Sequence, residues 1–210
     1  MKLKTFNNNN MGQNTYLYYD EKSGEGVIID AGCSEGDINA ITAFLNEDNI
    51  TVKGILLTHG HYDHIIAVEK LKNLTAAKVC SHKSEAQMLE SPALNLSTRI
   101  ETDIVVVPDK LFGDGDTFDV GGASLKVIHT PGHTTGGVCY YDNDNGNLFT
   151  GDTLFKQSVG RTDLASGSHR DLAANISNKL FALPDNTKVY PGHGPSTTVG
   201  YEKTNNPFVP

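Results

Sequence analysis

The stretch THGHYDH, residues 58–64, places three histidines and one aspartate within seven residues. It directly follows the apolar run at 55–57, which predicts a buried strand. In an extended segment, side chains two residues apart point to the same side, so His59, His61 and Asp63 can converge. The last histidine of the stretch faces a neighbouring position. This pattern predicts a metal site at the end of a strand.

Three later fragments are built in the same way: PGHT at 131–134, TGDT at 150–153 and PGHG at 191–194. Each follows a β-like run and carries glycine or proline beside the candidate ligand. Four strand ends that each deliver such a side chain into a loop favour one site on a rigid scaffold. The candidate ligands are His59, His61, Asp63, His64, His133, Asp152 and His193.

Seven ligands are too many for one ion, because a catalytic zinc is filled by three protein ligands and a water. They fit two ions that share one carboxylate and lie roughly 3.5–4 Å apart. The plainer alternative is a histidine-rich loop whose side chains only bond one another, but four dispersed fragments agree on the metal site. We expect two divalent ions, zinc first, with iron or manganese as alternatives.

The composition restricts the other choices. The 210 residues contain no linker or solenoid repeat, which predicts a single domain over 1–210. A net charge of −8 argues against a nucleic-acid partner. Cys33, Cys80 and Cys139 are expected to be free, buried thiols. Without a signal-like or membrane-spanning stretch, we expect a soluble cytoplasmic protein with no membrane partner, a monomer or weak homo-oligomer.

Strands and helices are both expected. Apolar runs predict strands at 16–19, 27–29, 55–57, 104–107, 125–128, 138–141 and 188–190. Helical periodicity predicts helices at 37–46, from just after residue 63, at about 83–89 and at about 170–181. Residues 7–10 are expected to form a loop. This order favours an α+β fold in which two sheets pack together with helices outside.

The four fragments together resemble the metallo-β-lactamase superfamily, and within it the short glyoxalase II-like (hydroxyacylglutathione hydrolase-like) group. The stretches at 160–164, 194–200 and 206–208 are similar to that group as well. The resemblance implies a four-layer αββα sandwich with two metals at one edge. It implies one ion held by His59, His61 and His133, a second held by Asp63, His64 and His193, and Asp152 bridging the two.

The resemblance also implies a metal-dependent hydrolase. Asp63 and Asp152 would be its catalytic carboxylates, holding a metal-bridging water as the nucleophile that cleaves a small S-acyl thioester such as hydroxyacylglutathione. The longer glyoxalase II enzymes carry a C-terminal helical region that grips glutathione, and this sequence lacks it. True β-lactamases of the commonest class place a cysteine in the second site, whereas this sequence has His64 and Asp152 among its candidate ligands.

Two alternatives remain open on the sequence. One is a persulfide dioxygenase of the same fold with a single iron, for which His59, His133 and Asp152 could supply the two histidines and the carboxylate. The other is a hydrolase of a different ester or amide.

The remaining polar residues have supporting roles. Asp30 is either an ordinary turn residue or a group that orients the ligand loop, and the sequence favours neither. His129 is expected to pack or support rather than to bind metal. His82 is expected to face solvent or cap a helix, and Arg161 to pair with Asp163 in the loop after Asp152.

Overall fold

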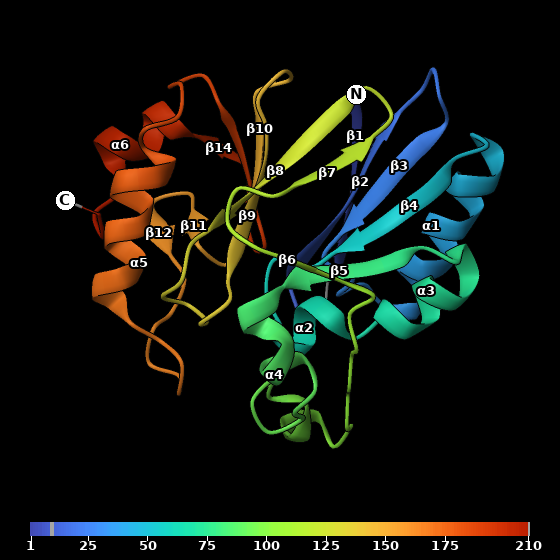
Figure 1. Cartoon of the computed structure of the whole chain (residues 1–210), viewed down its shortest axis with the longest axis horizontal. Helices are drawn as coiled ribbons and strands as arrows, with labels where there is room; N and C mark the ends of the chain where they lie inside the picture. Colours follow the sequence, from blue (N-terminus) through green and yellow to red (C-terminus); the bar gives the residue numbers. More distant parts are fainter. Residues whose placement is uncertain (9–10, 210) are drawn as a thin grey trace.

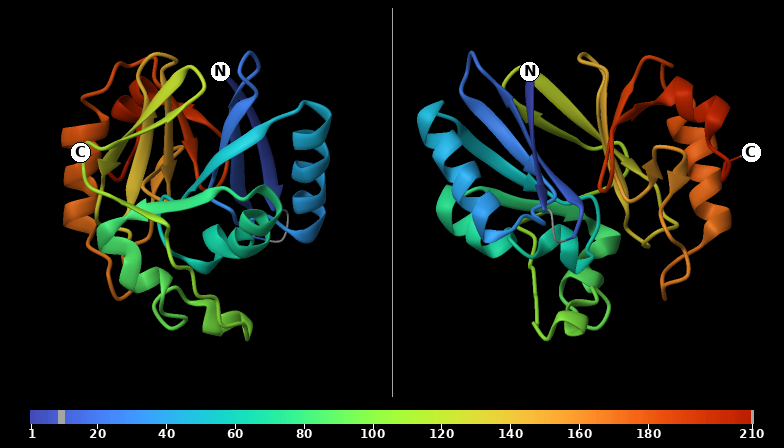
Figure 2. Two further views of the ribbon diagram at one scale, coloured as in Figure 1. Left: turned by 45° about the vertical axis from the view of Figure 1, so that its right-hand side comes forward. Right: turned by 180° about the vertical axis from the view of Figure 1, so that it is seen from behind.

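Two six-stranded sheets face each other, with helices on the outer side of each (Figures 1 and 2). This computed structural model describes residues 1–8 and 11–209. The first sheet has the order β1 (Lys2–Asn8), β2 (Gln13–Asp20), β3 (Glu25–Ile29), β4 (Thr51–Leu56), β5 (Lys78–His82) and β6 (Lys110–Phe112). Its first three strands are antiparallel, and the strands from β3 to β6 are parallel.

The second sheet comes almost entirely from the other half of the chain. Its order is β14 (Thr197–Thr198), β13 (Lys188–Pro191), β10 (Asn147–Gly151), β9 (Val138–Asp142), β8 (Ala123–His129) and β7 (Thr117–Val120). Its neighbours are antiparallel except β10 and β13, which are parallel. A small hairpin, β11 (Leu154–Phe155) with β12 (Ser158–Val159), follows β10.

The helices cover the outer faces and one end of this sandwich (Figure 1). The first sheet is covered by α1 (Glu35–Glu47) and α3 (Val68–Thr75), and the second by α5 (His169–Asn175) and α6 (Val199–Asn205). Two short helices, α2 (Tyr62–Ile65) and α4 (Ala86–Leu89), lie at the lower end in Figure 1. None of the helices within the described residues has the length and apolar character needed to cross a membrane.

Three apolar layers hold the four structural layers together. Alternation along the strands creates them, because successive side chains point to opposite faces. In β2, Leu17 packs towards α1 and α3, whereas Tyr16 and Tyr18 pack between the sheets. In β9, Tyr140 lies between the sheets and Cys139 faces the layer that holds α5. The predicted α+β, four-layer αββα arrangement is thus confirmed.

Helix α1 shows how local sequence sets these elements. Ser34 caps it by accepting from the backbone N–H of Asp37, while the Asp37 side chain accepts from the backbone N–H of Ser34. Ile38, Ile41 and Leu45 then recur at helical spacing and are buried against the first sheet.

Some predicted elements differ from the structure. The expected strand at 104–107 is extended but belongs to no sheet, because β6 takes the place beside β5; Val105 and Val107 are 56% and 64% exposed. The helix expected after Asp63 is broken at Ile66 and Ala67 into α2 and α3. The helix expected at 170–181 continues beyond α5 as a π-helical turn, Ile176–Leu180.

The expected loop at 7–10 is only partly a loop. Asn7 and Asn8 pair with β2 as the end of β1, and residues 9–10 lie outside the described part of the chain.

Candidate metal centre

All seven predicted ligands converge at the edge of the sandwich where β4, β8, β10 and β13 end. Their donor atoms form three overlapping groups, and within each group the atoms lie within 4.8 Å of one another. These groups are His59–His61–His133, His59–His64–Asp152 and Asp63–His64–His193. The structure therefore brings together every residue that the sequence selected, from four loops and both sheets.

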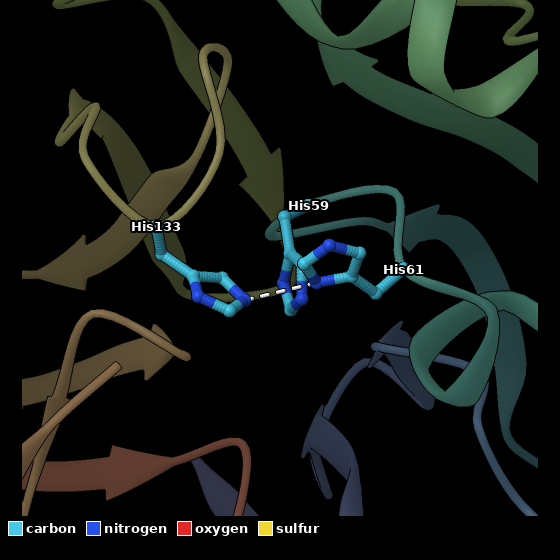
Figure 3. A group of neighbouring side chains, drawn as sticks. All are labelled: His59, His61 and His133. Carbon is cyan, nitrogen blue, oxygen red and sulfur yellow. Dashed lines mark hydrogen bonds between the residues drawn. The ribbon is translucent and has the colours of Figure 1, made fainter. Parts of the chain in front are cut away.

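The first group contains only imidazoles. His59 and His61 come from the loop after β4 and His133 from the loop after β8, and their rings point towards one another (Figure 3). His61 Nδ1 lies 2.9 Å from His133 Nε2. The Nε2 atom of His59 is buried and has no hydrogen-bond partner among the described residues. A cation at this point would give His59 Nε2 the partner it lacks, and it would have His61 Nδ1 and His133 Nε2 as neighbouring ligand atoms.

The third group, Asp63–His64–His193, mixes imidazole with carboxylate. His193 Nε2 lies 3.2 Å from an Asp63 oxygen and 3.3 Å from His64 Nε2. His64 is completely buried, whereas the side chains of His193 and Asp63 are 29% and 21% exposed. This half of the centre is therefore the more accessible to solvent.

Asp152 lies between the first and the third group. Its Oδ1 is 3.3 Å from His64 Nε2, and its Oδ2 is 3.6 Å from His133 Nε2 and 3.7 Å from His193 Nε2. One carboxylate thus borders both sets of histidines, which is the position a bridging ligand requires.

A second layer of hydrogen bonds fixes which ring nitrogen each histidine presents. His133 Nδ1 donates to the backbone oxygen of Arg161 at 2.8 Å, so its Nε2 faces the centre with a free lone pair. The Thr58 hydroxyl donates to Asp30 and can therefore accept from His59 Nδ1, 3.1 Å away. His59 then also presents an unprotonated Nε2.

Asp30 accepts three of these supporting hydrogen bonds. One of its oxygens accepts from the Thr58 backbone N–H at 2.8 Å, and the other accepts from the Thr58 hydroxyl at 2.7 Å and from His64 Nδ1 at 2.9 Å. Its backbone has a positive φ of 54°, a conformation that aspartate tolerates better than most residues. Of the two roles that the sequence left open, the structure shows the orienting one.

Burial and nearby charges shift the pKa values of the histidines differently in the two parts of the metal centre. Burial, with a smaller contribution from His133, lowers the pKa of His61 to about 3, and burial also lowers the pKa of His59 far below its ordinary value. Both are therefore neutral at pH 7 and able to donate a lone pair. Burial alone would lower the pKa of His64, but nearby carboxylates, Asp152 first, outweigh it and raise that pKa. The second half thus favours positive charge.

Two glycines leave room for the closely packed ligand side chains and their supporting residues. A Cβ on Gly192 would lie 2.3 Å from Asp152 Oδ1 and 2.6 Å from His64 Cε1. Gly151 has a positive φ of 48°, and a Cβ there would lie 2.1 Å from the Thr58 hydroxyl oxygen. Any larger residue at either position would displace a ligand or its support.

Glu85 is a supporting residue that the sequence analysis missed. It is fully buried, and its two oxygens accept from the backbone N–H groups of Gly60, at 2.8 Å, and Gly136, at 2.7 Å. It thereby ties the loop of His59 and His61 to the loop of His133. Burial raises its pKa to about 6. A single glutamate in a helical stretch has no spacing signal that could have marked it.

Replacement of Glu85 by alanine is expected to weaken binding of the metal roughly 10- to 100-fold, the range for groups that orient ligands. It should also lower the free energy of unfolding by about 1–3 kcal/mol for each buried N–H left unpaired. Glu85→Gln can still accept one of the two bonds and should fall between alanine and wild type. Metal titration and urea denaturation measure both effects. Unchanged metal affinity in Glu85→Ala would show that Glu85 does not hold the loops.

The loop of His193 is held from the opposite sheet, which the sequence also did not reveal. The Asn14 side chain donates to the backbone oxygens of Pro191 and Gly194 at 3.1 and 2.9 Å, and the Tyr16 hydroxyl donates to that of Pro191 at 2.6 Å. Strand β2 of the first sheet therefore positions a ligand carried by β13 of the second.

The other assigned roles hold with one correction. His82 caps a turn by accepting from the Ser84 backbone N–H, but it is buried rather than solvent-facing because its ring stacks on His129 at 4.0 Å. His129 donates to the Thr135 backbone oxygen and belongs to none of the ligand groups. Arg161 pairs with Asp163 through two contacts of 2.7 and 2.8 Å. The three cysteines are free and buried as expected.

Neutral imidazoles, carboxylates and an orphaned ring nitrogen together fit a divalent cation rather than a network of hydrogen bonds. Structural zinc sites are usually closed and rich in cysteine, whereas this cluster has no cysteine and is partly open. An αββα sandwich with such a cluster at one sheet edge defines a metallo-hydrolase type of protein.

Comparison with known proteins agrees with that class. The family model described as "Metallo-beta-lactamase superfamily" matches residues 9–193, and the chain belongs to that superfamily. It is 37% identical to a probable metallo-hydrolase, YqgX, of Bacillus subtilis over 87% of this chain and 86% of the relative. It is 32% identical to the hydroxyacylglutathione hydrolase GloC of Haemophilus influenzae, over 94% and 92%.

Solved structures show the same fold. The crystal structure of BLEG-1, described as a B3 metallo-β-lactamase, is 40% identical with a TM-score of 0.91 and 99% coverage of both chains. TTHA1623 in a di-iron-bound form is 32% identical, with a TM-score of 0.81 and full coverage of both chains. ETHE1 from Myxococcus xanthus is 29% identical, with a TM-score of 0.79 over 99% of this chain and 84% of the other.

Proposed function

We propose that this protein is a metal-dependent hydrolase of small S-acyl thioesters that uses two divalent ions, with zinc as the first choice. His59, His61 and His133 would hold one ion, and Asp63, His64 and His193 the other. Asp152, which borders both groups, would bridge them. When bound, the ions would supply a water acidified towards a pKa of about 7 and an electrophilic partner for the substrate carbonyl oxygen.

The observation that carries the choice of thioester is the lack of a proton donor beside the cluster. A pocket opens next to His61, and among the residues that line it only His61 and Glu85 can titrate. Glu85 accepts from two backbone N–H groups and, with a pKa of about 6, is mostly ionised at pH 7, so it is a poor proton donor there. An amide nitrogen must be protonated to leave, whereas a thiolate, whose acid has a pKa of about 8.5, leaves without help.

The chain's own residues then have defined tasks. Asp30, Thr58 and the Arg161 backbone oxygen keep three imidazoles in the tautomer that presents a lone pair. Asp63 and Asp152 supply the negative charge that balances the cations and the acceptors that orient a water. The relative GloC, named a hydroxyacylglutathione hydrolase, supports this class of substrate.

Two other reactions are favoured by particular neighbours. The likeness to BLEG-1, described as a B3 metallo-β-lactamase, supports cleavage of a cyclic amide. The likeness to ETHE1 keeps the persulfide dioxygenase open, in which His59, His133 and Asp152 would hold a single iron.

One panel separates the three reactions. Purified protein loaded with zinc, manganese or ferrous iron is assayed on acyl thioesters, on the β-lactam nitrocefin and on glutathione persulfide with an oxygen electrode. We expect thioester cleavage with kcat/KM at least ~10²-fold above that for nitrocefin, loss of activity on chelation and no oxygen uptake. Oxygen uptake with one iron per chain, or nitrocefin as the best substrate, would overturn the proposal.

A further inference from the structure

The pocket beside His61 has a volume of about 280 Å³. Its apolar lining comes from two parts of the chain that are far apart in sequence: the α4 region contributes Met88, Ala93, Leu94 and Leu96, and the loop before α5 contributes Leu164 and Ala165. In Figure 1 both parts extend towards the lower end of the view, the α4 region in green near the centre and the orange loop before α5 to its left. The pocket is therefore built by two parts of the chain that are distant in sequence. His61, which lines it, connects it to the metal centre.

Among the described residues, no lysine or arginine lines the pocket. Apart from the six apolar residues, His61 and Glu85, the lining consists of four uncharged polar side chains. Both oxygens of the Glu85 carboxylate accept from backbone N–H groups, and its negative charge would repel an anionic group in the pocket. A group that carries a carboxylate or phosphate would lose its hydration here without gaining a partner, which is costly. The lining therefore favours an uncharged, aliphatic group.

We propose that this pocket holds the acyl chain of the substrate and that the protein prefers thioesters of short, unbranched aliphatic acids. The inference rests on the proposed thioester hydrolysis. Thiol carriers such as glutathione bear several charges, which excludes the carrier from a lining without cations and leaves the acyl side. The volume lies at the small end of the range for ligand sites, which suits a chain of a few carbons.

The expected signature is a dependence on chain length. On thioesters of the neutral thiol N-acetylcysteamine, kcat/KM should rise up to ~4-fold for each methylene from acetyl to about hexanoyl, because each buried methylene is stabilised by transfer from water. Succinyl and glutaryl thioesters of similar length should react at least ~10-fold more slowly than their uncharged counterparts.

A filled pocket should remove this dependence. Ala165 is exposed in its loop, so Ala165→Phe can be accommodated without disturbing the core. In this variant kcat/KM for hexanoyl should fall at least ~10-fold while that for acetyl stays within about twofold, because only the longer chain reaches the pocket. Ala43→Phe, on the exposed face of α1, is the matched control and should leave the whole series unchanged.

A binding experiment tests whether the pocket holds an aliphatic chain independently of whether the protein cleaves thioesters. Hexanamide and acetamide are titrated into the zinc-loaded protein and followed by the methyl resonances of Met88 and Leu94. We expect shifts with hexanamide only, absent in Ala165→Phe. Thioester cleavage with a flat chain-length profile, or one that Ala165→Phe leaves intact, would overturn the acyl pocket while the hydrolase stands. If no thioester is cleaved, the proposed function fails, and hexanamide binding alone decides whether the pocket takes an aliphatic chain.

Discussion

Replacement of Asp152 by alanine should reduce the metal content from two ions to about one and lower kcat/KM on thioesters by a factor on the order of 10²–10³. Asp152 is the carboxylate that borders both histidine groups, with Oδ1 facing His64 and Oδ2 facing His133 and His193. Its loss removes the shared ligand and leaves several imidazoles facing one another without a balancing charge. Metal analysis and steady-state kinetics on the same preparation measure the two effects.

Asp144→Asn is the matched control, because Asp144 is an exposed carboxylate in the turn between β9 and β10, away from the ligand loops. It should retain two ions and wild-type rates. If Asp152→Ala also kept two ions and full activity, the carboxylate would not be the bridge, and the assignment of the centre would have to be changed.

Replacement of Asp30 by alanine should destabilise the protein by about 3–5 kcal/mol and weaken metal binding roughly 10- to 100-fold. Asp30 is buried, and its loss leaves the Thr58 backbone N–H, the Thr58 hydroxyl and His64 Nδ1 without their acceptor. Alanine also fits the positive φ at this position less well than aspartate does. Urea denaturation and metal titration measure the two losses.

Asp30→Asn separates the support of the fold from the choice of tautomer. Asparagine tolerates the positive φ and can still accept from the Thr58 backbone N–H, so it should lose less stability than alanine. Its amide group, however, can donate to His64 Nδ1, which would put the proton on Nε2 and block the ligand lone pair. We expect metal affinity as low as in Asp30→Ala. Wild-type affinity in the asparagine variant would show that Asp30 does not set the tautomer.

The ligand set could be predicted because each loop that carries ligands follows a strand and contains glycine or proline. Alternation from residue 59 to residue 63 was expected to bring His59, His61 and Asp63 together, and the loops of His133, Asp152 and His193 each add a ligand after a strand. Parallel strands deliver their loops to one edge, so agreement among fragments was enough to predict the convergence that the structure shows.

The supporting residues could not be predicted in this way, because their role depends on contacts distant in sequence. Glu85 acts through Gly60 and Gly136, and Asn14 acts through Pro191 and Gly194. Neither pair of partners is marked by spacing along the chain. The strand expected at 104–107 was predicted from a local pattern but did not form. Val106 is buried, as the apolar pattern suggests. A strand also needs a free sheet edge to pair with, and β6 already occupies that edge.

The count and position of bound metal ions test the central claim most directly. Crystals of the purified protein soaked in zinc and recorded on both sides of the zinc absorption edge should show two peaks. One should lie among His59, His61 and His133, the other among Asp63, His64 and His193, with Asp152 between them. One fully enclosed ion, or ions bound away from these side chains, would contradict the account.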